Sequence, residues 1–150
     1  AAYVARSVPD KEIIPWDGFC YVHSKIDVEK LKEAKHFNPE AKVMAHPECP
    51  PEILALADRI ESTSGMIRFA GESSSREFIL GTEIGLLHPI SKAWPEKQFY
   101  PASEKMLCPD MKKVTLENLA ESLETLSGEV RVSEKIRKKA WGAVHAMLMV

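Results

Sequence analysis

The chain has 150 residues, 45% hydrophobic and 28% charged, values that suit one folded domain or two small ones and exclude a disordered tail or a fibrous repeat. Lys and Arg number 20 against 22 Asp and Glu, so there is no basic excess to neutralise nucleic-acid phosphates or an anionic membrane surface. The longest apolar run is much shorter than the roughly 20 residues of a membrane-spanning helix, and no signal-peptide pattern opens the chain. We therefore expect a cytoplasmic protein with neither nucleic acid nor a membrane as partner.

The first predicted elements are the end of a helix over residues 1–6 and a short strand over residues 11–14. No capping residue precedes the helix, so we expect the chain to begin inside a structural element. Pro15 and the turn at 17–18 then place Cys20 in a loop just after the strand.

Residues 25–103 alternate between short apolar segments, typical of buried strands, and segments with helical spacing. This order predicts an α/β fold in three layers, a parallel sheet covered on both faces by the helices of right-handed crossovers. The expected strands are 41–46, 59–61, 77–81 and 98–100. The first expected helix spans 28–37 after the cap Asp27, and a second begins at 50–51. A third spans 66–70 after a loop at 62–65, and a fourth follows the cap Thr82.

Two further helices are predicted over residues 115–126 and 133–149, beyond Cys108. No strands remain in the chain for these helices to cover. We therefore expect them to pack against another part of a larger molecule.

The segment His46-Pro47-Glu48 directly follows an apolar strand, where open α/β sheets usually bind ligands. An imidazole and a carboxylate on either side of a proline can point into one crevice and supply a hydrogen-bond donor and a proton carrier. The structural alternative is that His46 satisfies a buried carbonyl while Glu48 begins the next helix. From spacing alone, this alternative is favoured.

Hydroxyl side chains gather at Ser62-Thr63-Ser64, before the predicted helix. Together with free backbone N–H groups, these hydroxyls could hold a phosphate or a carboxylate, although most such clusters are helix caps. The serines at 73–75 are interpreted as a solvated turn.

Three cysteines cannot all pair within one chain. Cys20 and Cys108 follow a similar sequence of elements, 88 residues apart (108 − 20), so two similar modules could each deliver one thiolate to a soft metal or an iron–sulfur cluster. Paired C-x-x-C motifs are absent, which disfavours zinc. Cys49 is expected to pack as a small apolar side chain, and His23 neighbours Cys20 without an evident third catalytic partner.

In their order along the chain, several of these segments resemble quinolinate synthase. The resemblance covers nearly the whole chain but only the C-terminal half of the family's length, roughly 300 residues or about two ordinary domains. The segments that carry it are 16–23, 46–49, 62–66, 99–101 and 108–112.

The resemblance implies three similar α/β modules around a pseudo-threefold axis, each sending one cysteine to a central [4Fe–4S] cluster. Cys20 and Cys108 would be the second and third ligands, and the first would belong to the absent module. On this alignment residues 1–23 finish the middle module, 24–108 form the third, and 109–150 are helices that return to pack on the first. Two of three ligands cannot encircle a cluster, so the isolated chain is predicted to be inactive.

The family is a transferase that condenses iminoaspartate with dihydroxyacetone phosphate to give quinolinate for NAD biosynthesis. By resemblance, His46, Pro47 and Glu48 line the substrate pocket, with Glu48 as general acid and base and His46 as hydrogen-bond donor. Ser62 and Thr63 would bind a carboxylate or phosphate. The cysteine-rich C-terminal redox motif of some members is absent after Cys108, so we predict no thiol–disulfide switch there.

Two other functions are compatible with the residues alone. One is a cluster-free α/β module that binds a phosphorylated metabolite at Ser62 and Thr63 and associates through its C-terminal helices. The other is a thiol enzyme that depends on Cys20, for which no base-orienting group is evident.

Overall fold

The computed structural model describes residues 2–149, which divide after Cys108 into a unit built on a sheet and a helical unit. Among the described residues, no helix has both the length and the apolar character needed to cross a membrane.

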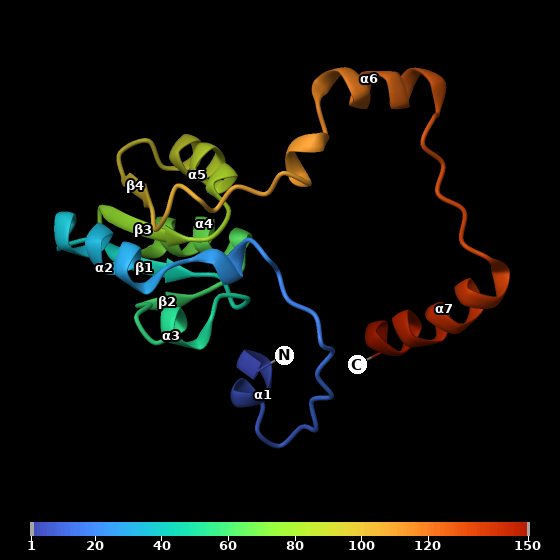
Figure 1. Ribbon diagram of the computed structural model, residues 1–150, viewed down its shortest axis with the longest axis horizontal. Helices are drawn as coiled ribbons and strands as arrows, with labels where there is room; N and C mark the ends of the chain where they lie inside the picture. The colour runs from blue at the N-terminus through green and yellow to red at the C-terminus, as the bar shows by residue number, and fades with distance from the viewer. Residues whose placement is uncertain (1, 150) are drawn as a thin grey trace. The chain divides into compact units, whose positions relative to one another are not determined.

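A four-stranded parallel sheet forms the centre of the first unit (Figure 1). Its strands are β1 Lys42–Ala45, β2 Arg59–Ile60, β3 Glu77–Gly81 and β4 Gln98–Pro101. Their order across the sheet is β2-β1-β3-β4, so the chain proceeds from β1 to one side and then returns to the other. The carboxyl ends of β1 and β3 therefore form a topological switch point, where open α/β sheets leave a crevice.

Helices and short 3-10 turns connect the strands of this unit. The prediction of the helix over residues 28–37 is confirmed, including the Asp27 cap, whose side chain accepts a hydrogen bond from the backbone N–H of Glu29 at 2.8 Å. The elements are α1 Ala2–Ser7, η1 His23–Lys25, α2 Val28–Phe37, α3 Pro51–Leu54, α4 Thr63–Glu72, η2 Ile84–Leu86 and α5 Leu87–Ala93. Of the helix predicted over 1–6, residue 1 lies outside the described part of the chain.

The core lies on both faces of the sheet, because alternate residues of a strand point to opposite sides. Val43 and Ala45 of β1 join one buried cluster, whereas Met44 between them joins the other. The first cluster includes Leu31 of α2 and Ile53 and Leu54 of α3; the second includes Met66 and Ala70 of α4 and Ile90 of α5. The predicted parallel sheet with helices on both faces is thus confirmed.

The strand predicted over residues 11–14 is wrong, because this segment has no regular secondary structure and pairs with none of the described strands. Its apolar residues Ile13 and Ile14 favour a strand, but a strand is stable only beside a partner. Ile14 is 85% exposed. Cys20 therefore follows an irregular segment and not a strand of the described sheet.

Two predicted helix starts also differ from the structure. Thr82 is not a cap; the side chain of Glu83 instead accepts a hydrogen bond from the N–H of Gly85 at 2.7 Å and opens η2. The helix predicted from Met66 begins at Thr63, because Ser62 caps it.

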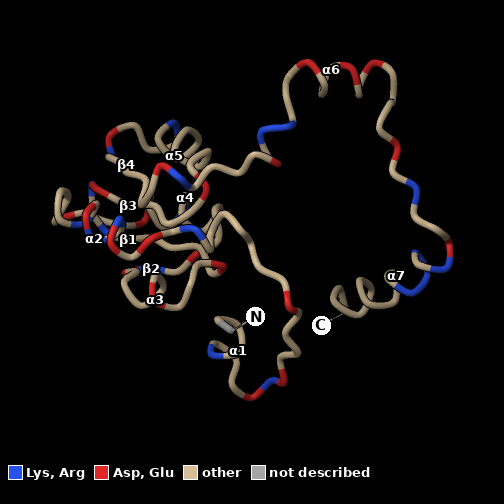
Figure 2. The backbone as a smooth tube through the Cα atoms, viewed as in Figure 1, with Lys and Arg blue, Asp and Glu red and all other residues tan. Residues whose placement is uncertain are grey.

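The second unit contains η3 Met111–Lys113, α6 Leu116–Thr125 and α7 Glu134–Leu148, which confirm the two predicted helices. The N-terminus of α6 is fixed by a capping box between Thr115 and Asn118. No described residue from 109 to 149 is buried. Acidic residues occur along α6 and basic residues in the first part of α7, as the red and blue segments of the backbone tube in Figure 2 mark.

Candidate functional site

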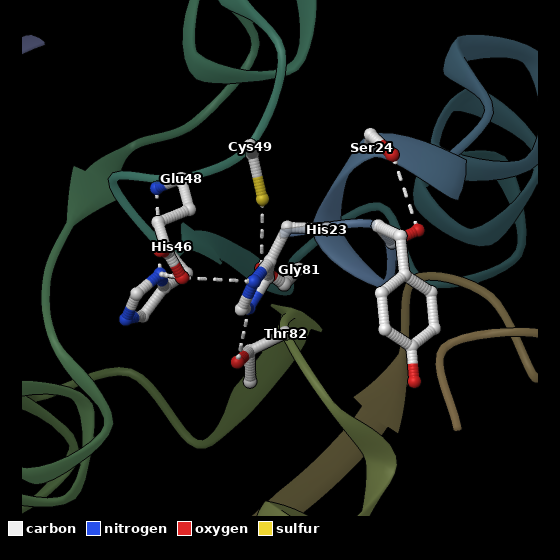
Figure 3. Close-up of polar contacts among 8 residues, drawn as sticks. His23, Ser24, His46, Glu48, Cys49, Gly81 and Thr82 are labelled. Atoms are coloured by element: carbon white, nitrogen blue, oxygen red, sulfur yellow. Dashed lines mark hydrogen bonds and ion pairs between the residues drawn. The ribbon is translucent and has the colours of Figure 1, made fainter. Parts of the chain in front are cut away.

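Polar side chains from three segments gather at the carboxyl ends of β1 and β3. Figure 3 shows His46 and Glu48 from the loop after β1, Thr82 from the end of β3, and His23 from η1 lying together. The backbone N–H of His46 donates to the carbonyl of Gly81 at 3.0 Å, which continues the pairing of the two strands by one residue. The sheet therefore brings the loop after β1 and the residue after β3 to the same point.

His23 is the deepest ionisable side chain of this group, with only 7% of its surface exposed. Its Nε2 atom lies 3.1 Å from the hydroxyl oxygen of Thr82. Its ring stacks on that of His46, with centroids 4.4 Å apart and planes inclined by 13°. The ring of His23 is thus held at one edge by a hydrogen bond and on one face by a second imidazole.

Glu48 lies in a turn between β1 and α3, so the structural alternative that it begins the next helix is wrong. Its backbone N–H donates to Nδ1 of His46 at 3.3 Å, which leaves the ring hydrogen of His46 on Nε2. Its carboxylate oxygen Oε2 lies 3.3 Å from Nδ1 of His23 and 3.4 Å from Nδ1 of His46. The Glu48 side chain is 55% exposed, so this carboxylate also faces outward.

Burial lowers the pKa of both imidazoles. For His23, burial and then the neighbouring His46 lower the pKa, and Glu48 only partly opposes this change. For His46, burial lowers the pKa against a smaller raising effect of Glu48. At neutral pH both rings are therefore neutral and act as hydrogen-bonding groups and not as stored positive charge.

The Nδ1 atom of His23 has an unused hydrogen-bonding capacity. It is buried and has no hydrogen bond of acceptable geometry, although Glu48 approaches to 3.3 Å. The contact is therefore an attraction at short range without good alignment. A buried polar atom in this condition is uncommon and is compatible with a catalytic role or with a bound water or ion.

The two predicted cluster ligands lie in neighbouring loops. Tyr21, which follows Cys20, places its hydroxyl 3.7 Å from the sulfur of Cys108, 87 residues away. Both cysteines are partly buried against the same core cluster, and neither forms a disulfide. Ligand atoms of Cys20, His23 and Glu48 all lie within 4.8 Å of one another, so a thiol, an imidazole and a carboxylate converge in a group that could hold a metal ion.

Cys49 has a different environment. It is buried, and its thiol donates to the carbonyl of Gly81 at 3.2 Å. Burial raises its pKa to about 12, so it carries no thiolate at neutral pH. The prediction that Cys49 packs as a small core side chain is confirmed.

A cavity of about 320 Å³ opens beside the gathered side chains, at the lower end of the size range of small-molecule sites. The segment that carries Cys20 and the loop after β1 meet in its wall. Its lining includes Cys20, Pro47, Glu48 and Cys49. The structure thus places Pro47 and Glu48 where a small molecule could contact them.

Ser62 and Thr63 lie at the same edge of the sheet, because Ile60 pairs with Ala45 one residue before His46. Both side chains are exposed. The hydroxyl of Ser62 accepts a hydrogen bond from the N–H of Gly65 at 3.2 Å, so Ser62 is the N-cap of α4.

Sequence reasoning missed His23 and Thr82 as members of the site. The spacing of Cys20 and His23 was visible, but the partners of His23 lie 25 and 59 residues further along the chain. No local sequence pattern predicts contacts between residues so far apart in the chain. The one available signal was that Thr82 directly follows a predicted strand, as His46 does.

The fold and the gathered residues define the class: an α/β layer with a candidate ligand site at its switch point, where thiols lie beside imidazole and carboxylate groups. Residues 1–149 match the model of the family described as Quinolinate synthetase A protein. The chain belongs to the quinolinate synthase family, as the resemblance predicted.

Individual relatives agree with this assignment. Quinolinate synthase of Thermodesulfovibrio yellowstonii is 48% identical over 148 residues, which cover 99% of this chain and 49% of the relative. Quinolinate synthase 1 of Methanosarcina acetivorans is 51% identical over 150 residues, which cover 100% of this chain and 49% of the relative. The chain therefore spans about half the length of the curated relatives it matches.

Proposed function

We propose that this chain supplies two cluster ligands and part of the substrate pocket of a quinolinate synthase. The enzyme would condense iminoaspartate with dihydroxyacetone phosphate, releasing phosphate and water, to form quinolinate for NAD biosynthesis. The observation that carries the proposal is the convergence of Cys20, His23 and Glu48 at the switch point of the sheet. Membership of the family supports the choice of reaction.

The cluster would be a [4Fe–4S] cluster held by Cys20, Cys108 and one cysteine from the part of the family's length that this chain lacks. The chemistry of the donors fits, because both thiols are partly exposed and Tyr21 links their loops. When bound through three thiolates, such a cluster supplies an iron that acts as a Lewis acid toward substrate oxygen or nitrogen.

His46 would orient a substrate carboxylate or a developing oxyanion. Its Nδ1 accepts the N–H of Glu48, so the ring presents Nε2–H as a donor. Its lowered pKa keeps the ring neutral, so it donates without adding a charge that the substrate would have to balance. The stacked ring of His23 prevents it from turning away.

Glu48 would transfer protons during the condensation and dehydration steps. Its carboxylate has one side against two imidazole nitrogens and the other toward the cavity. This position allows it to take a proton from substrate and return it to a departing hydroxyl. Pro47 restricts the backbone of the turn that holds it.

Ser62 and Thr63 would bind a carboxylate or the phosphate of the substrate at the N-terminus of α4. The free N–H groups and positive dipole end of that ten-residue helix favour an anion there. The cap role of Ser62 does not prevent this, because a hydroxyl can accept one hydrogen bond and donate another.

Residues 1–23 would complete the middle module of a three-module enzyme, 24–108 form the third, and 109–150 pack on the first. Large apolar side chains that are exposed here support the idea of further contacts: Trp16 is 88% exposed, Phe19 81% and Leu116 81%. The isolated chain would then lack one ligand and part of the pocket, and we expect it to be inactive.

The direct test is anaerobic assay of the full-length protein, with iminoaspartate generated in place and dihydroxyacetone phosphate added. We expect quinolinate to form, detected by chromatography, and to be absent when the 150-residue chain is assayed alone. Metal-stripped full-length protein is the control. A full-length protein that holds its cluster but yields no quinolinate would overturn the proposal.

A further inference from the structure

Thr82 occupies a special position in the site, directly after β3 and 2% exposed. Its side chain does not cap the following 3-10 helix. Its hydroxyl oxygen instead lies 3.1 Å from Nε2 of His23. The preceding residue, Gly81, accepts both the N–H of His46 and the thiol of Cys49. Residues 81 and 82, at the end of β3, thus contact His23, His46 and Cys49.

The contacts of His23 decide which nitrogen carries its hydrogen. A neutral imidazole has one N–H and one lone pair. An ionised carboxylate only accepts hydrogen bonds, and that of Glu48 lies 3.3 Å from Nδ1. Nδ1 of His46 accepts the backbone N–H of Glu48, but Nδ1 of His23 meets no donor among the described residues. A lone pair on Nδ1 of His23 would only be repelled by this carboxylate, so the hydrogen belongs on Nδ1.

The lone pair of His23 is then on Nε2, opposite the hydroxyl of Thr82. A hydroxyl can donate a hydrogen bond in this direction, whereas a carbonyl in its place would demand the opposite tautomer. Because the ring stacks on His46, it cannot exchange its two edges without leaving that contact. Glu48 therefore sets the tautomer, and the hydrogen bond from Thr82 satisfies Nε2 and holds that edge of the ring in place.

We propose that Thr82 is a positioning residue, whose hydroxyl donates to Nε2 of His23 and holds the ring with Nδ1–H facing Glu48. This inference rests on the proposed function for its consequence in catalysis. The buried Nδ1 atom, which lacks an aligned partner among the described residues, is then a donor ready for a substrate oxygen or for Glu48 as it moves.

Two substitutions separate the hydroxyl from the space it fills. Thr82→Val keeps the volume but offers only a methyl group to Nε2, so this edge of the His23 ring loses its hydrogen-bond partner. Thr82→Ser keeps the hydroxyl and loses only a methyl group. A matched control is Ser103→Ala, which removes another buried hydroxyl, one that accepts the N–H of Lys105 outside the site.

The experiment measures kcat, KM and iron content for the full-length protein and these variants under anaerobic conditions. We expect Thr82→Val to lower kcat by about 10-fold to 10²-fold, as the loss of an orienting partner commonly does, with iron content unchanged. Thr82→Ser and Ser103→Ala should remain within about threefold of the parent, because each leaves a hydroxyl opposite His23. Parent-like turnover of Thr82→Val, or equal loss in Thr82→Ser, would overturn the proposal.

A second measurement does not depend on activity. ¹⁵N spectra of full-length protein labelled at histidine distinguish a ring protonated on Nδ1 from one protonated on Nε2, with His23→Asn used for assignment. We expect His23 to carry its hydrogen on Nδ1. A parent protein with hydrogen on Nε2 would refute the role of Thr82 even if quinolinate is formed, whereas an inactive protein with the expected tautomer would refute only the proposed function.

Discussion

The loop after β1 and the turn after β2 end neighbouring parallel strands at the same sheet edge, but they use their polar side chains differently. The loop after β1 brings His46 and Glu48 against the ring of His23 from η1, and its backbone bonds to the end of β3. The turn after β2 uses Ser62 to cap the helix that follows it. Lying at a strand end is therefore not enough to make a candidate site. Polar side chains gather only where a second strand end and a third segment meet the loop, as they do at the switch point.

The largest effect is expected from removing the carboxylate of the first loop. Glu48→Gln should lower kcat by about 10²-fold or more if Glu48 transfers protons in the slow step, because the amide has a similar shape but cannot carry the proton. The measurement is steady-state turnover of the full-length protein under anaerobic conditions. Glu52→Gln, at an exposed position in α3, is the matched control. A parent-like rate in Glu48→Gln would remove that residue from the chemistry.

A smaller effect is expected at the second turn, where capping and substrate binding can be separated. Ser62→Ala should cost about 1 kcal/mol of stability, whereas Ser62→Gly should cost only a few tenths, because glycine is tolerated as an N-cap. If the hydroxyl also binds an anion, both variants should raise KM by about 10-fold. Unfolding in urea and steady-state kinetics give the two numbers. A KM unchanged in both variants would leave Ser62 with its cap role alone.

The imidazoles of His23 and His46 predict that the stability of the folded protein depends on pH. Their pKa values are lowered in the folded protein, so below the ordinary value of about 6.5 the unfolded chain binds more protons. The free energy of unfolding is therefore retained above pH 6.5. It decreases as the pH is lowered below 6.5, by up to about 1.4 kcal/mol per pH unit for each histidine. Urea unfolding of full-length protein between pH 7.5 and 5 measures this slope, and the double variant His23→Asn, His46→Gln should flatten it. An equal slope in that variant would assign the effect to other groups.

The smallest effect is expected at Cys49, which lies in the same loop but is buried. Its pKa of about 12 leaves almost no thiolate at pH 8, so iodoacetamide should label Cys20 and Cys108 of metal-free protein long before Cys49. Mass spectrometry of peptides after a short reaction provides the readout. Early labelling of Cys49 would show that the loop after β1 opens readily and is less fixed than its contacts indicate.

Local patterns predicted much of the fold. Asp27 before a helical face predicted α2, and the apolar run at 77–81 predicted β3 to the residue. These predictions succeeded because capping and burial of a short run are decided by neighbours in sequence. The segment 11–14 failed for the opposite reason, since a strand also requires a partner strand, and none of the described strands pairs with it.

The candidate site was predictable only in part. His46 and Glu48 were found because they directly follow an apolar strand, and the loops of Cys20 and Cys108 indeed lie close together. His23 was missed because its partners come from other strands. Thr82 was misjudged as a cap because sequence does not show that its hydroxyl faces an imidazole from η1.

The central claim is that Cys20 and Cys108 hold one iron–sulfur cluster while Cys49 does not. The most direct measurement is iron and sulfide content, with the absorbance near 400 nm, of anaerobically reconstituted full-length protein and its single Cys→Ser variants. We predict about four irons per chain in the parent and in Cys49→Ser, and a loss of most iron in Cys20→Ser and Cys108→Ser. Full iron content and unchanged absorbance in either of those two variants would contradict the account.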